Sequence, residues 1–317
     1  MNEGNGVYLV TGGAGFIGSN IVEALVARGT SVRVLDDLSN GREENLAPFS
    51  DRVDFVRGDL RDRGAVRACM RGVEVVLHLG ALGSVKRSVE DPLTSNEVNV
   101  TGTLNVLAAA KDAGVRRVVF SSSSSVYGEN PTLPKREDLP CLPISPYAVS
   151  KLAAESYARV FARLYDLETV CLRYFNVFGP RQRPDSPYAA VIPLFMQCAL
   201  DARPVTIYGD GLQSRDFTYV SNVVRANLAA ADAAGVSGRV FNIACAERYS
   251  VLDIVSILGE AIGRHVDVVH EEARIGDVRH SQADVSAAQQ ALGYSVEVGL
   301  REGLARTWDA FCQRSAA

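Results

Sequence analysis

A glycine-rich stretch near the start of the chain places the strongest constraint on its fold. Residues 11–18 read Thr-Gly-Gly-Ala-Gly-Phe-Ile-Gly, after an apolar run at 7–11 and before a helical pattern that begins at Ile17. Glycines at this spacing allow a tight turn and let the backbone approach a pyrophosphate closely. The N-terminus of the helix adds N–H donors and a favourable dipole for the phosphates. The stretch therefore predicts a strand, a turn and a helix that together bind a dinucleotide.

An acidic residue supports this interpretation and indicates which dinucleotide is bound. Two overlapping glycine patterns are present, Gly12-Gly15-Gly18 and Gly13-Gly15-Gly18. Asp36 ends the next apolar run, 18 residues after Gly18. A carboxylate there accepts hydrogen bonds from the adenosine ribose hydroxyls and repels a 2′-phosphate. Residues 37–40 contain no base, so NAD is favoured over NADP; Arg42 is the one residue nearby that argues the other way.

Short apolar runs alternate with helical patterns through the first half of the chain. The expected strands are 7–11, 31–36, 53–56, 75–79, 117–122 and 169–173. The expected helices are 17–28, 63–71, 94–113 and 146–164. The strands are mostly continuous Val/Leu runs without in/out alternation, as in parallel strands covered on both faces. We therefore predict an α/β fold with a doubly wound parallel sheet.

The pattern changes after about residue 176. Residues 179–193 contain four prolines and are not expected to form regular structure. A helix at 194–202, a strand at 205–208, a strand at 240–243 and a helix at 251–261 are expected to follow. We expect residues 1–176 and 216–244 to form the dinucleotide-binding domain, and residues 177–215 and 245–317 a smaller C-terminal lobe that binds substrate.

Composition excludes several classes of partner. The 317 residues carry a net charge of −4, so the chain lacks the excess of basic residues that is typical of nucleic-acid-binding proteins. The six cysteines lack metal-chelating spacing and are typical of buried thiols in a reducing compartment. No apolar run approaches the roughly 20 residues that span a bilayer, and the polar N-terminus does not resemble a signal peptide. We expect a cytoplasmic protein without a metal site or a membrane partner.

Tyr147 and Lys151 stand four residues apart at the start of an expected helix, so their side chains share one face. A tyrosine with an ordinary pKa of about 10 must lose roughly 3 pKa units, about 4 kcal/mol, to act as a base near neutrality. A lysine ammonium one turn away, beside a positively charged nicotinamide, is an adequate source of that shift. The serine run 121–125 ends the intervening strand. Together these residues predict a site for proton transfer beside the dinucleotide.

These motifs resemble those of extended short-chain dehydrogenases/reductases, in particular the nucleotide-sugar epimerase/dehydratase group, from Val7 to about Trp308. The resemblance implies a Rossmann domain and a catalytic trio of Ser123, Tyr147 and Lys151, because Ser123 stands four residues before the tyrosine of Val126-Tyr127-Gly128. The NAD-binding residues it implies, with those of the glycine loop, are Gly12, Gly15, Phe16, Ile17, Gly18, Asp36, Asp37, Ser39, Asn40, Gly41, Asp59, Leu60, Asn99, Tyr147 and Lys151.

The residues after Ser123 indicate the reaction within this family. Nucleotide-sugar 4,6-dehydratases carry an Asp-Glu pair there, and UDP-glucuronate decarboxylases carry a glutamate just before the Val-Tyr-Gly motif. This chain has Ser124 and Ser125. The resemblance then implies a UDP-sugar 4-epimerase: Tyr147 takes the proton of the 4-hydroxyl, C4 gives hydride to NAD, and the 4-keto sugar turns to receive it on its other face. A dehydratase, or a regulator that binds NAD without catalysis, are the alternatives.

The resemblance also implies residues that hold the UDP-sugar. They are Ser84, Ser123, Ser124, Asn176, Arg183, Ala190, Tyr208, Arg215, Arg274, Asp277 and Ser281. Ser281 replaces the bulky tyrosine of glucose-specific enzymes and leaves room for an N-acetyl group. Arg183 stands where UDP-glucuronate 4-epimerases hold the sugar carboxylate, but those enzymes tend to have threonine at Asn176. We therefore expect UDP-N-acetylglucosamine or its uronate first and UDP-glucuronate second. The helices 94–113 and 146–164 resemble those of a homodimer interface.

Overall fold

The computed structural model describes residues 6–185, 189–272 and 279–316. Its centre is a seven-stranded parallel sheet with the strand order β11-β6-β5-β4-β1-β2-β3. The strands are β1 (Val7–Thr11), β2 (Val32–Asp36), β3 (Val53–Arg57), β4 (Val73–His78), β5 (Arg117–Ser123), β6 (Glu168–Tyr174) and β11 (Arg239–Ile243). The sequence predicted each of them to within two residues at either end. The doubly wound α/β fold is confirmed.

The inner strands of the sheet are buried on both faces, which explains their continuous apolar sequences, whereas the edge strand β3 is only partly buried. In β4, Val75 and Leu77 belong to one hydrophobic cluster and Val76 to the other, on the opposite side of the sheet. In β1, Val10 and Leu9 are divided in the same way. Since both sides of each strand need apolar side chains, no polar face interrupts the run.

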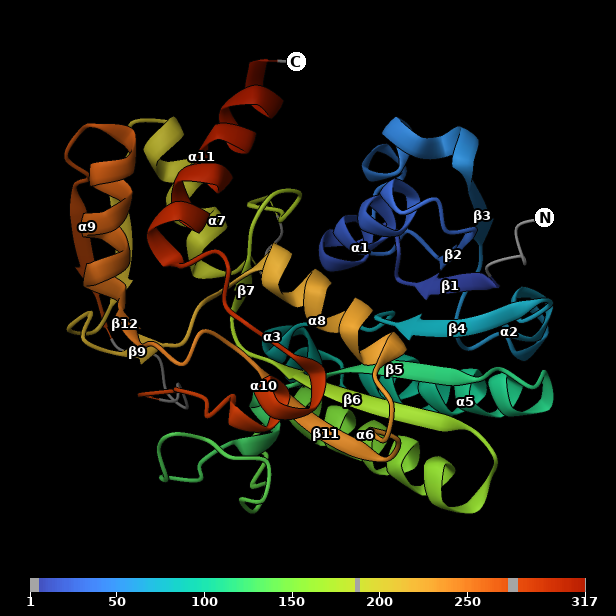
Figure 1. Cartoon of the computed structure of the whole chain (residues 1–317). Helices are drawn as coiled ribbons and strands as arrows, with labels where there is room; N and C mark the ends of the chain where they lie inside the picture. The colour runs from blue at the N-terminus through green and yellow to red at the C-terminus, as the bar shows by residue number, and fades with distance from the viewer. Residues whose placement is uncertain (1–5, 186–188, 273–278, 317) are drawn as a thin grey trace.

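Helices cover both faces of the sheet (Figure 1). The helices of this region are α1 (Phe16–Ala27), α2 (Arg63–Cys69), α3 (Val85–Glu90), α4 (Pro92–Asn96), α5 (Gly102–Asp112), α6 (Pro146–Leu164), α8 (Val220–Asp232) and α10 (Ser286–Leu292). Helices α1 and α8 pack together on one face, and α2, α5 and α6 on the other. The chain builds β1, β2 and β3 outward in one direction, then returns to place β4 on the other side of β1. Dinucleotides bind at such a switch point, beside the carboxyl ends of the strands.

The expected single helix over residues 94–113 is wrong in detail. The structure has α4, then a turn of π type at Glu97–Thr101, then α5. Such turns are rare and are often found at functional sites. Here the turn contains Asn99, whose side chain is buried among polar partners described below. Apolar periodicity does not reveal a single widened turn, so the sequence pattern predicted one uninterrupted helix.

A second group of elements lies beyond the carboxyl ends of the strands (Figure 1). It contains α7 (Val191–Leu200), α9 (Val251–Ile262) and α11 (Leu300–Ala316), which pack on one another. Three two-stranded pairs accompany them: β7 (Val177–Phe178) with β10 (Thr218–Tyr219), β9 (Ser214–Arg215) with β12 (Tyr249–Ser250), and β8 (Val205–Tyr208) with β13 (Val268–Glu271). The division of the chain into two lobes stays a prediction; α10, which falls in the expected second lobe, packs on β11 and α8.

The start of α7 corrects one expectation. Residues 179–193 were expected to lack regular structure, but the helix begins at Val191 and includes Pro193. Pro193 lies in the first turn, where a backbone N–H has no partner within the helix, so the missing donor costs little there.

No helix in the described ranges is long and apolar enough to cross a membrane. Within the same ranges, no group of three or more His, Cys, Asp or Glu side chains is arranged to hold a metal ion.

Candidate active site

The glycine loop between β1 and α1 has no room for side chains at two positions. Gly12 has a φ of +69°, and a Cβ added to it would lie 2.8 Å from the backbone of Gly80. A Cβ at Gly18 would lie 2.1 Å from the carbonyl oxygen of Gly12. Gly13 instead faces the side chain of Val34 in the core. Of the two overlapping patterns, Gly12-Gly15-Gly18 is therefore the one whose glycines face the site.

This loop forms one wall of a cavity of about 330 Å³ at the carboxyl ends of β1, β2 and β4, which we call the first cavity. All of the expected NAD-binding residues line it except Asn99, Tyr147 and Lys151. Ser84, expected to contact the sugar, lies in this cavity as well. The opposite wall, which no motif indicated, consists of Leu79, Gly80, Ala81, Leu82, Gly83 and Arg87. Its signal in the sequence was Gly80, two residues after β4 ends, whose backbone lies against Gly12 of the glycine loop.

Asp36 is buried at the end of β2, and both of its carboxylate oxygens accept backbone bonds. Ala14 N donates to Oδ2 and Leu38 N to Oδ1, each at 2.9 Å. Burial raises the pKa of Asp36, and these two hydrogen bonds oppose that rise. A carboxylate oxygen has a second acceptor position, so hydrogen bonds from ribose hydroxyls remain available to it. With glycine at positions 12 and 18 and a carboxylate at the cavity wall, the chain's own residues fit a dinucleotide.

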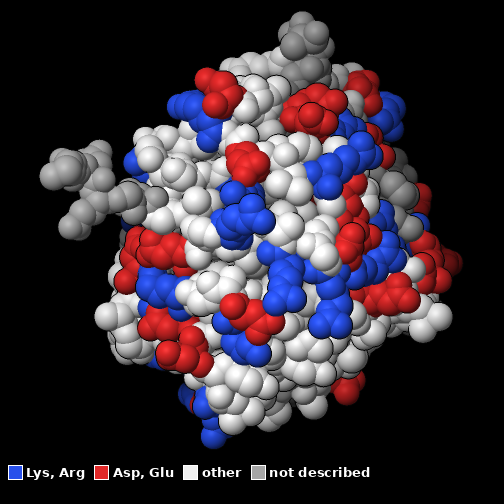
Figure 2. Space-filling model, turned by 90° about the vertical axis from the view of Figure 1, so that its right-hand side faces the viewer, with Lys and Arg blue, Asp and Glu red and all other residues white. Residues whose placement is uncertain are grey.

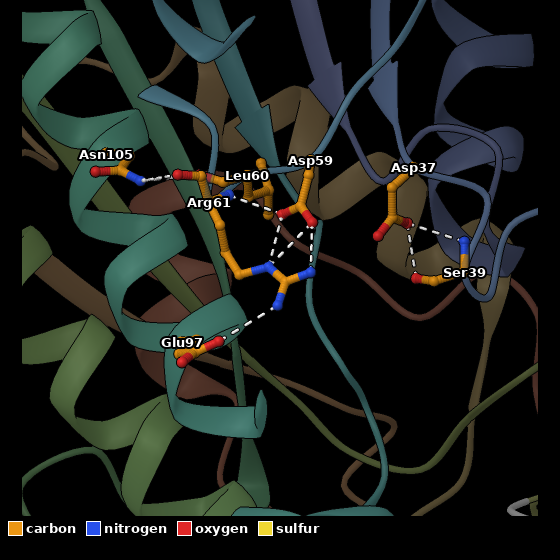
Figure 3. A network of polar contacts seen from close by, with 7 residues as sticks. All are labelled: Asp37, Ser39, Asp59, Leu60, Arg61, Glu97 and Asn105. Carbon is orange, nitrogen blue, oxygen red and sulfur yellow. Dashed lines mark hydrogen bonds and ion pairs between the residues drawn. The ribbon is translucent and has the colours of Figure 1, made fainter. Parts of the chain in front are cut away.

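Asp59 and Asp37 lie on the rim of the first cavity, and each has a partner within the chain (Figure 3). Arg61 binds Asp59 through two nitrogens, with Nη2 to Oδ2 at 2.6 Å, and lowers the pKa of the carboxyl. Arg61 also reaches Glu97 at 3.3 Å. Asp37 accepts from the amide and hydroxyl of Ser39. Arg61, which no motif indicated, thus fixes the orientation of Asp59, one of the expected NAD-binding residues.

The expected catalytic trio comes together where β5 ends and α6 begins. Ser123 is the last residue of β5, and its side chain is close enough to Tyr147, in the first turn of α6, to lower the pKa of that hydroxyl. Lys151, one turn later, is buried; its Nζ donates to the carbonyl of Ser121 at 2.8 Å. Ser145 caps α6 by accepting from the amide of Ala148, which sets where the helix begins. Spacing on α6 thus places both side chains toward the end of β5.

Burial dominates the electrostatics of this trio. It raises the pKa of Tyr147, and the bond to Ser123 is the contribution that lowers it. It lowers the pKa of Lys151 to about 7. Nearby His78 is buried between Thr11 and Thr103, and burial together with the Lys151 charge lowers its pKa to about 3, so it is neutral. The chain alone does not supply the lowering of the tyrosine pKa by Lys151 that the sequence analysis expected.

Asn99 does not line the first cavity but holds its wall in place. Its Oδ1 accepts from the amide of Leu82 at 2.8 Å. Its Nδ2 donates to Ser150 Oγ on α6 at 3.0 Å. Asn99 therefore connects the wall after β4 to the helix that carries Tyr147 and Lys151.

A second cavity of about 310 Å³ lies among the elements beyond the sheet, and we call it the second cavity. Four of the residues expected to hold the UDP-sugar line it: Asn176, Ala190, Tyr208 and Arg215. Arg215 Nη1 donates to the carbonyls of Ser214 and Arg279, which fixes part of its guanidinium. Apolar walls come from Phe178, Val191, Ile192, Phe195, Ile207, Phe217 and Val251, most of which no motif indicated. An apolar pocket with a few polar groups is typical of a small-molecule site.

The remaining expected substrate residues lie elsewhere. Ser281 lies beside β9, where its amide donates to the carbonyl of Ser214 at 3.0 Å. Its Oγ is buried and has no hydrogen-bond partner within the described ranges. Ser124 is partly buried next to Ser123. Arg274 and Asp277 fall outside the described residues.

Arg183 is engaged by a neighbouring acid outside both cavity walls. Its Nε lies 3.0 Å from Asp185 Oδ1, and Asp185 Oδ2 is also bound by Arg42 at 2.5 Å. Arg42 is the base that complicated the choice between NAD and NADP. Because Asp185 binds both arginines, each has part of its positive charge offset within the chain.

Comparisons with known proteins agree with this geometry. The model of the NAD dependent epimerase/dehydratase family matches residues 8–244. The UDP-glucose 4-epimerase of Mycolicibacterium smegmatis is 42% identical, over 97% of this chain and 99% of that protein. The UDP-glucuronate 4-epimerase of Thermodesulfobacterium geofontis is 34% identical, over 95% of each. A UDP-N-acetylglucosamine 4-epimerase from Methanobrevibacter ruminantium, solved with UDP-N-acetylmuramic acid, superposes with a TM-score of 0.94 and 39% identity, over 98% of this chain and 99% of that one.

Proposed function

The chain belongs to the NAD dependent epimerase/dehydratase family, with NAD as its cofactor, and on this premise we propose that it is a UDP-sugar 4-epimerase. The observation that carries the proposal is the grouping of Ser123, Tyr147 and Lys151 at the edge of the sheet where the first cavity also lies. The residues that follow Ser123 add no pair of carboxyl groups that could act as acid and base. Ser125 Oγ donates to Ser123 Oγ at 2.9 Å, at a position where water elimination needs a carboxylate.

One acid does contact the serine run, but it is already paired. Glu155 accepts from Ser122 Oγ at 2.7 Å and from Arg173 Nη2 at 2.6 Å, and all three side chains are buried. Both oxygens of this carboxylate are thus held in the core, Oε1 by Arg173 Nη2 and Oε2 by Arg173 Nε and Ser122 Oγ, so Glu155 forms a structural ion pair. This favours epimerisation over the dehydratase alternative.

The roles of the chain's residues follow from their contacts. Bound NAD supplies the acceptor and donor of hydride at C4 of the sugar. Tyr147 accepts the proton of the sugar 4-hydroxyl and later returns one, and the Ser123 hydroxyl beside it binds the 4-oxygen and eases this transfer. Lys151, anchored on the carbonyl of Ser121, stabilises the tyrosinate when it carries its own proton. Because the reaction returns C4 to its starting oxidation level, no external oxidant is consumed.

We propose UDP-N-acetylglucosamine, or its uronate, as the first substrate. A serine at position 281 leaves the space that an N-acetyl group needs, and its buried Oγ has no partner in the described part of the chain. Arg183 supports UDP-glucuronate as the second candidate, but Asp185 already holds that guanidinium. An arginine whose charge is offset in this way offers less to a sugar carboxylate.

The proposal is tested by proton NMR of the purified protein with UDP-N-acetylglucosamine, UDP-glucuronate or UDP-glucose, without added NAD. We expect the anomeric signal of the galacto isomer, largest for the N-acetyl sugar, and none with the Tyr147→Phe variant. A stable keto sugar would instead identify a dehydratase. Retained NAD with no product from any of the three sugars would favour the non-catalytic alternative.

We also propose a homodimer, formed by helices α3, α4 and α6. They expose seven large hydrophobic side chains: Val85, Val89, Leu93, Val149, Tyr157, Val160 and Leu164. Leu93 is 77% and Leu164 is 70% exposed, which is costly for a helix left in water. Helix α5 adds no large apolar side chain to this face, unlike the expected helix at 94–113. Light scattering should give twice the chain mass, and the Leu93→Asp/Leu164→Asp variant should give one.

A further inference from the structure

A buried acid in the second half of the chain has no role in the chemistry described above. Asp216 lies between β9 and β10, and none of its surface is exposed. Its two neighbours along the chain, Arg215 and Phe217, both line the second cavity. An ionised carboxylate is expensive to bury, so its presence here requires compensating hydrogen bonds.

Those hydrogen bonds come from backbone amides in two distant segments. Cys245 N donates to Oδ1 at 2.9 Å, and Ala246 N, in the same loop after β11, is a further donor. Ala283 N donates to Oδ2 at 3.1 Å. Burial raises the pKa of Asp216 to about 7, and the three amide bonds act against that rise. The side chain thus connects the β9–β10 link to residues 245–246 and to residue 283.

The backbone of Asp216 makes a fourth connection, to a residue of the cavity wall. Asn176 Nδ2 donates to the carbonyl of Asp216 at 2.9 Å, and the carbonyl of Asn176 accepts from Thr218 N at 3.2 Å. Asn176 has a φ of +33°, a left-handed conformation that residues other than glycine seldom adopt. Because its side chain and its carbonyl are both held by residues 216–218, this conformation is fixed from the same place.

The segment that Asp216 holds through Ala283 contains Ser281, the residue expected to face the substituent on the sugar. That segment is also attached at Ser214, which accepts from the amide of Ser281, and at Lys135, whose amide donates to the carbonyl of Gln282. Arg215, in the wall of the second cavity, binds the carbonyl of Arg279 in this segment, and Asp216 adds a fully buried contact next to it. Shifting this contact would change the distance between Ser281 and the wall residues Asn176 and Arg215.

We propose that Asp216 is a positioning residue of the substrate site: its carboxylate fixes the segment carrying Ser281 relative to the wall formed by Asn176 and Arg215, and so sets the affinity for the nucleotide sugar. The effect on affinity rests on the proposed function of the second cavity. The positioning of the segment by the carboxylate does not depend on that function. An asparagine at position 216 keeps the size of the side chain, yet it places an NH₂ donor against a backbone N–H donor. One or more buried amides then lose their acceptor.

The experiment compares Asp216→Asn with a matched control, Asn227→Asp. Asn227 is also fully buried, accepts from Tyr174 and donates to the carbonyl of Val223, but it lies on α8 outside the residues that line the second cavity. For each holoprotein we would measure the NAD content, KM and kcat with UDP-N-acetylglucosamine, and amide hydrogen exchange. The peptides of interest contain residues 245–246 and 283.

For Asp216→Asn we expect KM to rise about tenfold, since a buried amide left without its acceptor costs on the order of 1–3 kcal/mol, a tenfold change in an equilibrium being 1.4 kcal/mol. The value of kcat should change less than the value of KM, and the NAD content should stay at the wild-type level. Exchange should become faster in both peptides and not elsewhere. Unchanged exchange in both peptides, or an equal rise of KM in Asn227→Asp, would overturn the proposal.

A second measurement needs no variant. UDP alone, added to the wild-type holoprotein, should slow exchange in residues 206–217 and in both Asp216-bound segments together. Protection confined to residues 206–217 would contradict a positioning role. If the wild-type protein turns over no UDP-sugar, the proposed function fails, while exchange in Asp216→Asn still decides whether this carboxylate holds the two segments.

Discussion

The first and second cavities are built in different ways from one chain. The first cavity is lined by short contiguous stretches that follow β1, β2, β3 and β4, and its shape depends on backbone and glycine. The second is lined by side chains from residues 176–182, 190–195, 206–217 and 251, joined by two-stranded pairs and by Asp216. A site made of consecutive backbone tolerates few substitutions, whereas a site made of dispersed side chains can change its ligand one residue at a time. We therefore expect the first cavity to fix the cofactor and the second to determine the sugar.

The largest effect should come from Tyr147, the expected acid–base group at the start of α6. We expect Tyr147→Phe to lower kcat about a thousandfold, within the range for loss of a general acid–base group, while the content of bound NAD stays unchanged. Tyr157→Phe, on the exposed side of the same helix, is the control and should keep full activity. Both variants would be followed by NMR of the anomeric protons. Substantial turnover by Tyr147→Phe would show that another residue moves the proton.

In the first cavity, Gly18→Ala should lower the free energy of unfolding by about 3 kcal/mol. The variant should also lose most of its bound NAD. The added Cβ would lie 2.1 Å from the carbonyl oxygen of Gly12, so the loop must move. Gly299→Ala is the matched control, because a Cβ there meets nothing within 4 Å. Urea unfolding and the absorbance of released NAD measure the two effects. Full NAD retention in Gly18→Ala would contradict a site built from backbone.

A smaller effect tests the burial of Lys151. Its pKa, about 7, lies below the ordinary 10.5, so the folded protein binds this proton less tightly than the unfolded chain. Above pH 10.5 the amine is neutral in both states, and burying Lys151 carries no ionisation cost. As the pH falls toward 7, only the unfolded chain takes up the proton, and the free energy of unfolding decreases. Lys151→Met removes this dependence. Freed of NAD, the variant should gain about 2 kcal/mol in unfolding free energy relative to wild type between pH 9 and pH 7.

The control for this series is Lys86→Met, whose lysine is exposed on α3. It should follow the wild-type curve at every pH. A constant difference between Lys151→Met and wild type across this range would mean that Lys151 is not buried in its neutral form.

The smallest effect concerns the choice of sugar. Asp185→Asn frees Arg183 and Arg42 from a shared carboxylate, so the ratio of kcat/KM for UDP-glucuronate to that for UDP-N-acetylglucosamine should rise about two- to fivefold, as expected for a partly exposed pair worth up to about 1 kcal/mol. Asp201→Asn, which breaks the exposed pair with Arg203, should leave the ratio unchanged. A fall in the ratio would contradict the view that Asp185 competes for Arg183.

The two cavities also differ in how much of their structure could be predicted from the sequence. The seven strands and the glycine loop were predictable because each depends on neighbours in the chain: apolar runs for buried strands, and glycines where a side chain has no room. The π-type turn at Glu97–Thr101 and the wall at Leu79–Leu82 were missed, because they are held by a contact between residues far apart in the chain, Asn99 in the turn and Leu82 in the wall. Such contacts leave no periodic signal.

In the second half of the chain, the roles of Asn176, Tyr208 and Arg215 came from family resemblance rather than from local pattern. The structure places all three around one cavity. Asp216 was passed over although it adjoins Arg215, since nothing in a sequence shows that an acid is fully buried or that its partners are the amides of Cys245 and Ala283.

The most direct test of the account is the fate of hydrogen at C4. UDP-N-acetylglucosamine carrying deuterium at C4 would be incubated with the holoprotein in ordinary water, and the product examined by NMR and mass spectrometry. If Tyr147 moves only the hydroxyl proton and hydride is returned to the same carbon, the galacto product must keep its deuterium at C4. Loss of that deuterium to water would show that C4 is inverted by proton exchange, and the proposed epimerase chemistry would be wrong.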